Sequence, residues 1–176
     1  MQARYDELTL ETQGDGEIVD LTSYAQKTIA NYGYSDGLCT VFVAHSTCGV
    51  TTIEYEPGCN QDFNDTLEKL APQDDRWEHN ERNADTNGHS HVRAALIGPS
   101  VTIPFSGSEL MLGTWQKIVL IDFDDRPRSR RVVVQVLGSG TSSIAAPVAE
   151  HHRQTTASTI ESRTCSSSTE SSPPTV

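Results

Sequence analysis

The chain has 176 residues and a formal net charge of −11, from 13 Lys and Arg against 24 Asp and Glu. This length fits one domain with a sizeable core, and the negative charge repels nucleic-acid backbones and anionic lipid surfaces. Residues 1–9 lack the apolar stretch of a signal peptide, and no run approaches the roughly 20 apolar residues that span a bilayer. We therefore expect a cytoplasmic protein that binds neither nucleic acid nor membrane, with its four cysteines as free thiols.

The first third of the chain predicts a strand followed by a helix. Residues 4–11 alternate weakly, and the turn-forming QGDG after them indicates a hairpin connection. Apolar residues then recur at helical spacing over residues 21–32. Asp20 or Thr22 is suited to cap the start of this helix, and Gly33 is suited to follow its end.

Two short β-branched runs and a second helix come next. Residues 38–44 and 50–55 are too short for helices and are expected to be buried strands that pair with each other. A second helix is expected to begin near Asn60, after a Pro-Gly break, and to end before Pro72.

The C-terminal half predicts a β-meander. Strand signals at residues 100–105, 109–112, 115–123 and 130–137 are separated by turn-forming segments. Because strands outnumber helices and follow one another in hairpin-like order, we expect an antiparallel α+β domain rather than a doubly wound, nucleotide-binding sheet.

From residue 139 onward the composition changes to Ser, Thr, Pro and Ala. Such a segment buries too little apolar surface to offset the entropy lost on ordering. We expect a folded domain over residues 1–138 and a disordered tail over residues 139–176. His151 and His152 fall in this tail and are expected to be solvated.

Four other histidines, His45, His79, His89 and His91, lie in polar, loop-like sequence, so none is expected to have a core role. His45 ends an apolar strand run, and the polar residues that follow it, Thr47 among them, are expected at the rim of a sheet.

The HSH segment suggests a metal site. His89 and His91 would lie on one side of an extended segment and chelate a divalent cation, with His45 supplied from elsewhere in the chain. Glu54, Asp62 and Asp85 could complete an oxygen-rich Mg²⁺ or Mn²⁺ site. In so acidic a chain, the alternative is that each carboxylate is simply solvated.

A cluster of arginines suggests phosphate binding. Guanidinium groups bind phosphate through two parallel hydrogen bonds. The alternative is a basic hairpin whose arginines pair with Asp122, Asp124 and Asp125 across the turn. The arginines are Arg126, Arg128, Arg130 and Arg131.

Four segments together resemble the YjbQ family over residues 4–138: HSTCGVTTIEYEPG from His45, NGHSHVRAALIGPSVTIPF from Asn87, LGTWQKIVLIDFD from Leu112 and RSRRVVVQVLG from Arg128. The resemblance implies an antiparallel β-sandwich with two main helices, assembled as a homotrimer with a polar site near subunit boundaries. It also implies a secondary thiamine-phosphate synthase activity beside an unsettled primary role.

Carried over position by position, the resemblance matches motif histidines to His45 and His91, and a further histidine to His79. These three are the expected metal ligands, for Mg²⁺, Mn²⁺ or Zn²⁺, whereas His89 occurs in only some relatives. The resemblance also implies recurring positions at Glu54, Asp62, Trp115 and Arg130. Ile53 departs from the pattern, since many relatives have Asn there, which leaves the role of Glu54 open.

Three functions follow as hypotheses. The first is an enzyme that couples a pyrimidine methyl diphosphate to a thiazole phosphate and releases pyrophosphate. Its expected catalytic residues are Glu54, Asp85, Trp115 and Arg130, and Thr47, Asp62 and Arg130 are expected to bind the cofactor or phosphate. The second is a trimer that binds metal or phosphate without turnover. The third is a metal-dependent hydrolase of a small phosphorylated molecule.

Overall fold

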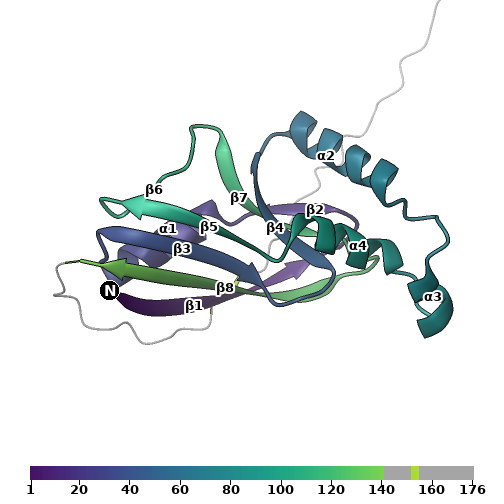
Figure 1. Ribbon diagram of the computed structural model, residues 1–176, viewed down its shortest axis with the longest axis horizontal. Coiled ribbons are helices and arrows are strands. Elements are labelled where there is room, and N and C mark those ends of the chain that lie inside the picture. Colours follow the sequence, from purple (N-terminus) through teal and green to yellow (C-terminus); the bar gives the residue numbers. More distant parts are fainter. Residues whose placement is uncertain (141–151, 155–176) are drawn as a thin grey trace, which may run out of the picture.

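The computed structural model describes residues 1–140 and 152–154, which form two β-sheets and four helices (Figure 1). The larger sheet has the strand order β6-β5-β3-β8-β1-β9. Its pairs are antiparallel except for β1 with β9. The strands are β1 (Gln2–Thr12), β3 (Asp36–Val43), β5 (Ser100–Ser106), β6 (Glu109–Leu110), β8 (Arg128–Ser139) and β9 (His152–Gln154).

The smaller sheet has the order β2-β7-β4, with both pairs antiparallel. Its strands are β2 (Glu17–Asp20), β4 (Cys48–Glu54) and β7 (Gln116–Asp122). The helices are α1 (Thr22–Tyr32), α2 (Pro57–Leu70), α3 (Glu78–Asn83) and α4 (Gly88–Ile97). In the described part of the chain, no helix combines the length and the apolar character needed to cross a membrane.

The main core lies on one face of the larger sheet. In β8, Val132, Val134 and Val136 are fully buried, whereas the residues between them are not, because successive side chains of a strand point to opposite faces. Ala25 and Ile29 of α1 pack into the same apolar cluster, as do residues from the smaller sheet. The opposite face of the larger sheet is left uncovered by any described element.

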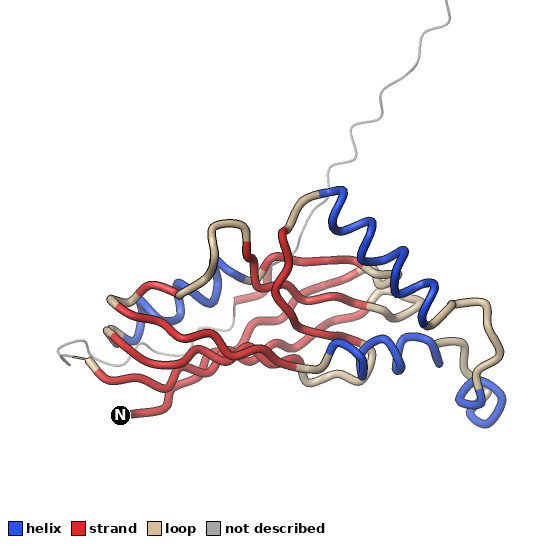
Figure 2. Tube along the Cα trace, turned by 45° about the horizontal axis from the view of Figure 1, so that its top comes forward, coloured by secondary structure: helices blue, strands red, loops and turns tan. Residues whose placement is uncertain are grey.

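A second apolar cluster lies on the other face of the smaller sheet. Val119, Ile121 and Phe123 pack there against Leu67 of α2 and Ala94 of α4. Figure 2 shows the helices that follow β4 gathered over the end of the strands away from the N-terminus. This arrangement places α4 beside the strand ends that form the pocket described below.

The predicted antiparallel α+β fold is confirmed, and so is the first helix. Gly33 follows α1 with a φ of 65°, the left-handed conformation that glycine adopts without steric cost. The predicted cap was wrong, because Leu21 occupies the N-cap position and has no capping side chain. Asp20 instead accepts a hydrogen bond from the Thr22 amide at 2.8 Å.

The predicted strand partners were largely wrong. β1 and β2 form no hairpin, because β1 pairs with β8 and β2 pairs with β7. β3 and β4 lie in different sheets, and of the predicted meander only β5 and β6 pair with each other. The pairings join segments far apart in the sequence, so neither turn residues nor short apolar runs could identify them.

Two helical features also differ from expectation. α2 begins at Pro57 rather than near Asn60, because the Glu56 carboxylate accepts hydrogen bonds from the amides of Gly58 and Cys59. α3 and α4 were not predicted. The expected disordered tail lies mostly outside the described residues. Ser139 is the last residue of β8, and residues 152–154 pair with Leu8, Thr9 and Leu10.

Candidate functional site

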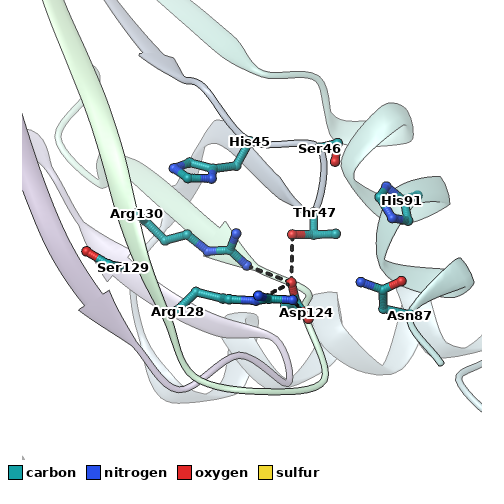
Figure 3. Close-up of a pocket in the computed structure, with 9 residues that line it drawn as sticks. All are labelled: His45, Ser46, Thr47, Asn87, His91, Asp124, Arg128, Ser129 and Arg130. Carbon is teal, nitrogen blue, oxygen red and sulfur yellow. Dashed lines mark hydrogen bonds and ion pairs between the residues drawn. The ribbon is translucent and has the colours of Figure 1, made fainter. Parts of the chain in front are cut away.

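A polar pocket lies where β3, β7 and β8 meet the N-terminal end of α4 (Figure 3). Its volume is about 480 Å³. The chain leaves β3 and enters β4 along one wall, and begins β8 along another. The lining residues are His45, Ser46, Thr47, Asn87, His91, Asp124, Arg128, Ser129 and Arg130.

A buried ion pair forms the base of this pocket. Arg130 donates to Asp122 from Nε at 2.7 Å and from Nη2 at 2.5 Å, and both side chains are almost completely buried. Thr12 adds a third hydrogen bond to the Asp122 carboxylate, at 2.5 Å. Because β8 brings Arg128 and Arg130 to the same face, two residues apart, both guanidinium groups reach this region.

Asp124 lies beside this pair and is equally well satisfied. It accepts hydrogen bonds from Thr47 Oγ1 at 3.0 Å, Arg128 Nε at 3.0 Å and Arg130 Nη2 at 3.3 Å. Burial opposes the ionisation of Asp124, but the hydrogen bonds from Arg128, from the Asp125 amide and from Thr47 outweigh it and hold the pKa of its carboxyl well below the usual range. Asp124 is therefore ionised, with its charge matched by arginine.

His45 is fixed in one tautomer. Its Nε2 accepts a hydrogen bond from the backbone N–H of Arg131 at 2.9 Å. A ring nitrogen that accepts carries no proton, so the proton of the neutral ring lies on Nδ1. Burial lowers the pKa of His45, and the positive charge of Arg130 lowers it further. At neutral pH His45 is therefore uncharged and offers its one N–H from Nδ1.

The α4 side of the pocket supplies Asn87 and His91. Asn87 is 4% exposed, and its Oδ1 is buried without a hydrogen-bond partner among the described residues. The His91 ring packs on the His79 ring of α3, with 4.5 Å between ring centroids. The side-chain amide nitrogen of Asn83 lies 3.3 Å from Nδ1 of His79. This chain of contacts positions the His91 ring at the pocket wall.

The structure brings together four of the predicted site residues and separates the others from them. His45, Thr47, His91 and Arg130 line the pocket, and His79 contacts it through His91. Glu54, Asp62 and Trp115 are exposed and line none of it, and Asp85 pairs with Arg126 at 3.6 Å.

The prediction that His89 lies outside the core was wrong. The HSH segment is the first turn of α4 rather than an extended strand, so His89 and His91 point to different sides of the helix. His89 is 2% exposed, and its Nδ1 has no hydrogen-bond partner in the described structure. Its Nε2 lies 3.2 Å from Ser90 Oγ, which donates to the Phe123 carbonyl.

The alternative interpretation of the arginine cluster is the correct one for three of its members. Arg126, Arg128 and Arg130 all pair with aspartates of residues 122–125. Arg131 faces the other side of β8 and pairs with Glu7 at 2.9 Å. Sequence reasoning missed Asn87 and Ser129 as pocket residues, although both lie in the segments that carry the family resemblance.

Comparison with known proteins decides the family. The family model described as UPF0047 protein YjbQ-like matches residues 6–139. A UPF0047 protein of Archaeoglobus fulgidus is 37% identical over 131 residues, which cover 74% of this chain and 99% of that protein. The chain belongs to the YjbQ-like UPF0047 family. A UPF0047 protein of Mycobacterium tuberculosis is 46% identical over 112 residues, covering 63% of this chain and 82% of that protein.

Solved structures of YjbQ-like proteins share the fold. A YjbQ-like protein of unknown function from Sulfolobus solfataricus superposes with a TM-score of 0.74 at 30% identity, covering 78% of this chain and 99% of that one. A YjbQ/UPF0047 protein from Clostridium acetobutylicum gives a TM-score of 0.68 at 36% identity, covering 74% and 98%. The family is thus established. The Sulfolobus protein is described as of unknown function, and the Clostridium protein as uncharacterized.

Proposed function

We propose that the pocket binds the phosphate group of a small phosphorylated molecule. The observation that carries this proposal is the hydrogen-bonding character of the lining. Both buried aspartates are saturated by arginine and hydroxyl donors, so they do not repel an anion as free carboxylates would. The groups left over are largely donors: the Nδ1–H of His45, the hydroxyl of Ser46 and the remaining N–H groups of Arg128.

Arg130 contributes to this site indirectly. Its side chain is 3% exposed and donates two hydrogen bonds to the Asp122 carboxylate, so its guanidinium lacks the freedom to turn toward a ligand. Its role in our proposal is to cancel the charge of Asp122 and Asp124 beneath the ligand. Arg128 is more accessible, with 37% of its side chain exposed, and is the guanidinium that reaches a bound phosphate.

The finer proposal is the coupling reaction of a secondary thiamine-phosphate synthase. Loss of diphosphate from a pyrimidine methyl diphosphate builds negative charge on the leaving group, and preorganised N–H donors stabilise such charge. In this proposal Arg128 and His45 supply those donors. Glu54, Asp62 and Trp115 lie outside it, so they would act here only if a second copy of the chain brought them to it.

The binding of a divalent cation remains a prediction. The hydrogen bonding of His45 argues against His45 as one of the ligands. The lone pair on Nε2 is engaged by the Arg131 amide, and Nδ1 carries the proton. Ligation through Nδ1 would move that proton to Nε2, where it would face another N–H. In the described part of the chain, no three His, Cys, Asp or Glu side chains are grouped to hold a metal ion.

We also propose self-association, as the family resemblance predicts a homotrimer. The uncovered face of the larger sheet carries exposed Tyr5, Leu38, Phe42 and Leu137. A shallow pocket on this face is lined by residues of β1, β3 and β8, Phe42 and Val133 among them. A broad apolar sheet face of this kind is typical of an interface between subunits.

Pyrophosphate release tests the finer proposal. Purified protein would be incubated with the pyrimidine methyl diphosphate and the thiazole phosphate, with Mg²⁺ present. We expect turnover that is lost in Arg128→Gln and kept in Arg82→Gln, whose side chain is exposed on α3. Saturable binding of the two substrates without turnover would favour a binding protein, and the absence of both would contradict the proposal.

A further inference from the structure

A second polar groove lies on another part of the molecule, between α1, β6 and the start of β7. Its volume is about 490 Å³. It shares no residue with the pocket around His45. Its lining includes Lys27 and Lys117, the hydroxyl residues Ser23 and Thr114, and the side chains of Leu110 and Leu112.

The charge of this groove is opposite to that of the chain. The net charge is −11, and the only lysines are Lys27, Lys69 and Lys117, of which two line this groove. None of the lining residues is acidic. In the structure of residues 1–140, no ion pair involves either of these lysines. Both lysines therefore line one concave surface, and neither has a carboxylate partner in the described structure.

The groove is held in shape by hydrogen bonds that do not use the lysines. Gln26 of α1 donates to the Ser108 carbonyl at 2.7 Å and accepts from the Leu110 amide at 3.0 Å. Thr22 accepts from the Ile118 amide at 2.9 Å. These bonds tie α1 to β6 and β7, so the groove exists before any ligand binds and little entropy is lost in forming it.

Apolar surface lies beside the positive charge. Leu110 and Leu112 are partly buried and pack on the main core, so they present a fixed apolar wall. The first turn of α1 has no acidic residue and no capping side chain at Leu21, although Asp20 engages the Thr22 amide. The Asp20 carboxylate offsets the positive end of the α1 dipole, so the positive charge of the groove comes from the two lysines.

We propose that this groove binds a small organic anion, with the acidic group between Lys27 and Lys117 and the apolar body along the two leucines. The shared chemistry of the ligand is a carboxylate or phosphate monoester on an apolar chain. The inference does not depend on the function proposed for the pocket around His45.

Titration of ¹⁵N-labelled full-length protein with hexanoate, hexyl phosphate and uncharged hexanol tests this site. We expect saturable shifts of the Gly113 and Thr114 amides with at least one of the two anions, and not with hexanol. The Lys27→Gln, Lys117→Gln double variant should raise the dissociation constant by roughly twofold to thirtyfold, since each exposed charge pair contributes about 0.2–1 kcal/mol. Added NaCl should weaken binding in the same direction.

Lys69→Gln is the matched control, because Lys69 lies in the last turn of α2 and not in the groove. It should leave the dissociation constant unchanged. Equal binding by the double variant, or equal binding of hexanol, would overturn the inference. Shifts confined to Ser46, Asn87 and His91 would also overturn it, because they would place the anion in the other pocket.

Discussion

The Arg130–Asp122 pair is the residue-scale feature on which the proposed site depends. Removing one member of a buried ion pair leaves an uncompensated charge, which costs about 3–5 kcal/mol. We therefore expect Arg130→Ala to lower the free energy of unfolding by that amount in urea denaturation. Arg131→Ala removes an exposed pair with Glu7 and should cost less than about 1 kcal/mol. Similar small losses for both variants would mean that Arg130 is not structural.

Two neutral histidines predict how stability changes with pH. Burial lowers the pKa of His89 below its ordinary 6.5, and the nearby charge of Arg93 lowers it further, against the opposing effects of Asp125, Glu68 and Asp15. Burial likewise lowers the pKa of His45. The unfolded chain therefore binds more protons just below pH 6.5. The contribution of these two histidines to the free energy of unfolding is fully present above pH 6.5. It is lost as pH drops toward their folded-state pKa values.

The measurement is the urea midpoint between about pH 5 and 8. Each such histidine contributes a slope of up to about 1.4 kcal/mol per pH unit. His89→Gln should make the acid side of this profile shallower. A variant profile parallel to that of the unmodified protein would show that His89 does not titrate in this way.

At the scale of elements, the packing of α4 on β4 controls the pocket wall. A Cβ on Gly49 would lie 2.7 Å from Cγ2 of Ile97, so Gly49 allows α4 to approach the sheet closely. We expect Gly49→Ala to cost about 1–3 kcal/mol by overpacking and to shift the NMR signals of Asn87 and His91. Gly58→Ala is the control, because its Cβ would meet only the flexible side chain of Glu56. Unchanged NMR signals of Asn87 and His91 in Gly49→Ala would show that the packing of α4 on β4 does not control the pocket wall.

The elements also show what the sequence could predict. The helix over residues 21–32 and most strands were predictable because their apolar residues repeat with the local period. The strand partners were not predictable. For example, β1 and β8 pair although they lie at opposite ends of the domain's sequence. The site was predictable only in part. His45 ends a strand, but α4 was missed because the HSH segment was interpreted as extended, although half of GHSHVRAALI is apolar. The burial of His89 and the pocket role of Asn87 were therefore missed.

At the scale of the whole molecule, the uncovered sheet face predicts association. We expect sedimentation velocity at micromolar concentration to show a trimer. Phe42→Glu should dissociate it, because a buried unpaired carboxylate at an apolar interface is costly. Leu70→Glu should have no effect, since Leu70 is exposed on α2. A stable monomer of the unmodified protein would contradict the assembly.

Calorimetric titration with inorganic pyrophosphate tests the central claim, that the pocket around His45 holds a phosphate group. We expect one-site binding that weakens about tenfold or more in His45→Ala and in Arg128→Gln, because a hydrogen bond to a charged group contributes about 1.5–3 kcal/mol. Arg82→Gln should bind as the unmodified protein does. Pyrophosphate binding that is absent, or that is unchanged in both pocket variants, would contradict the account.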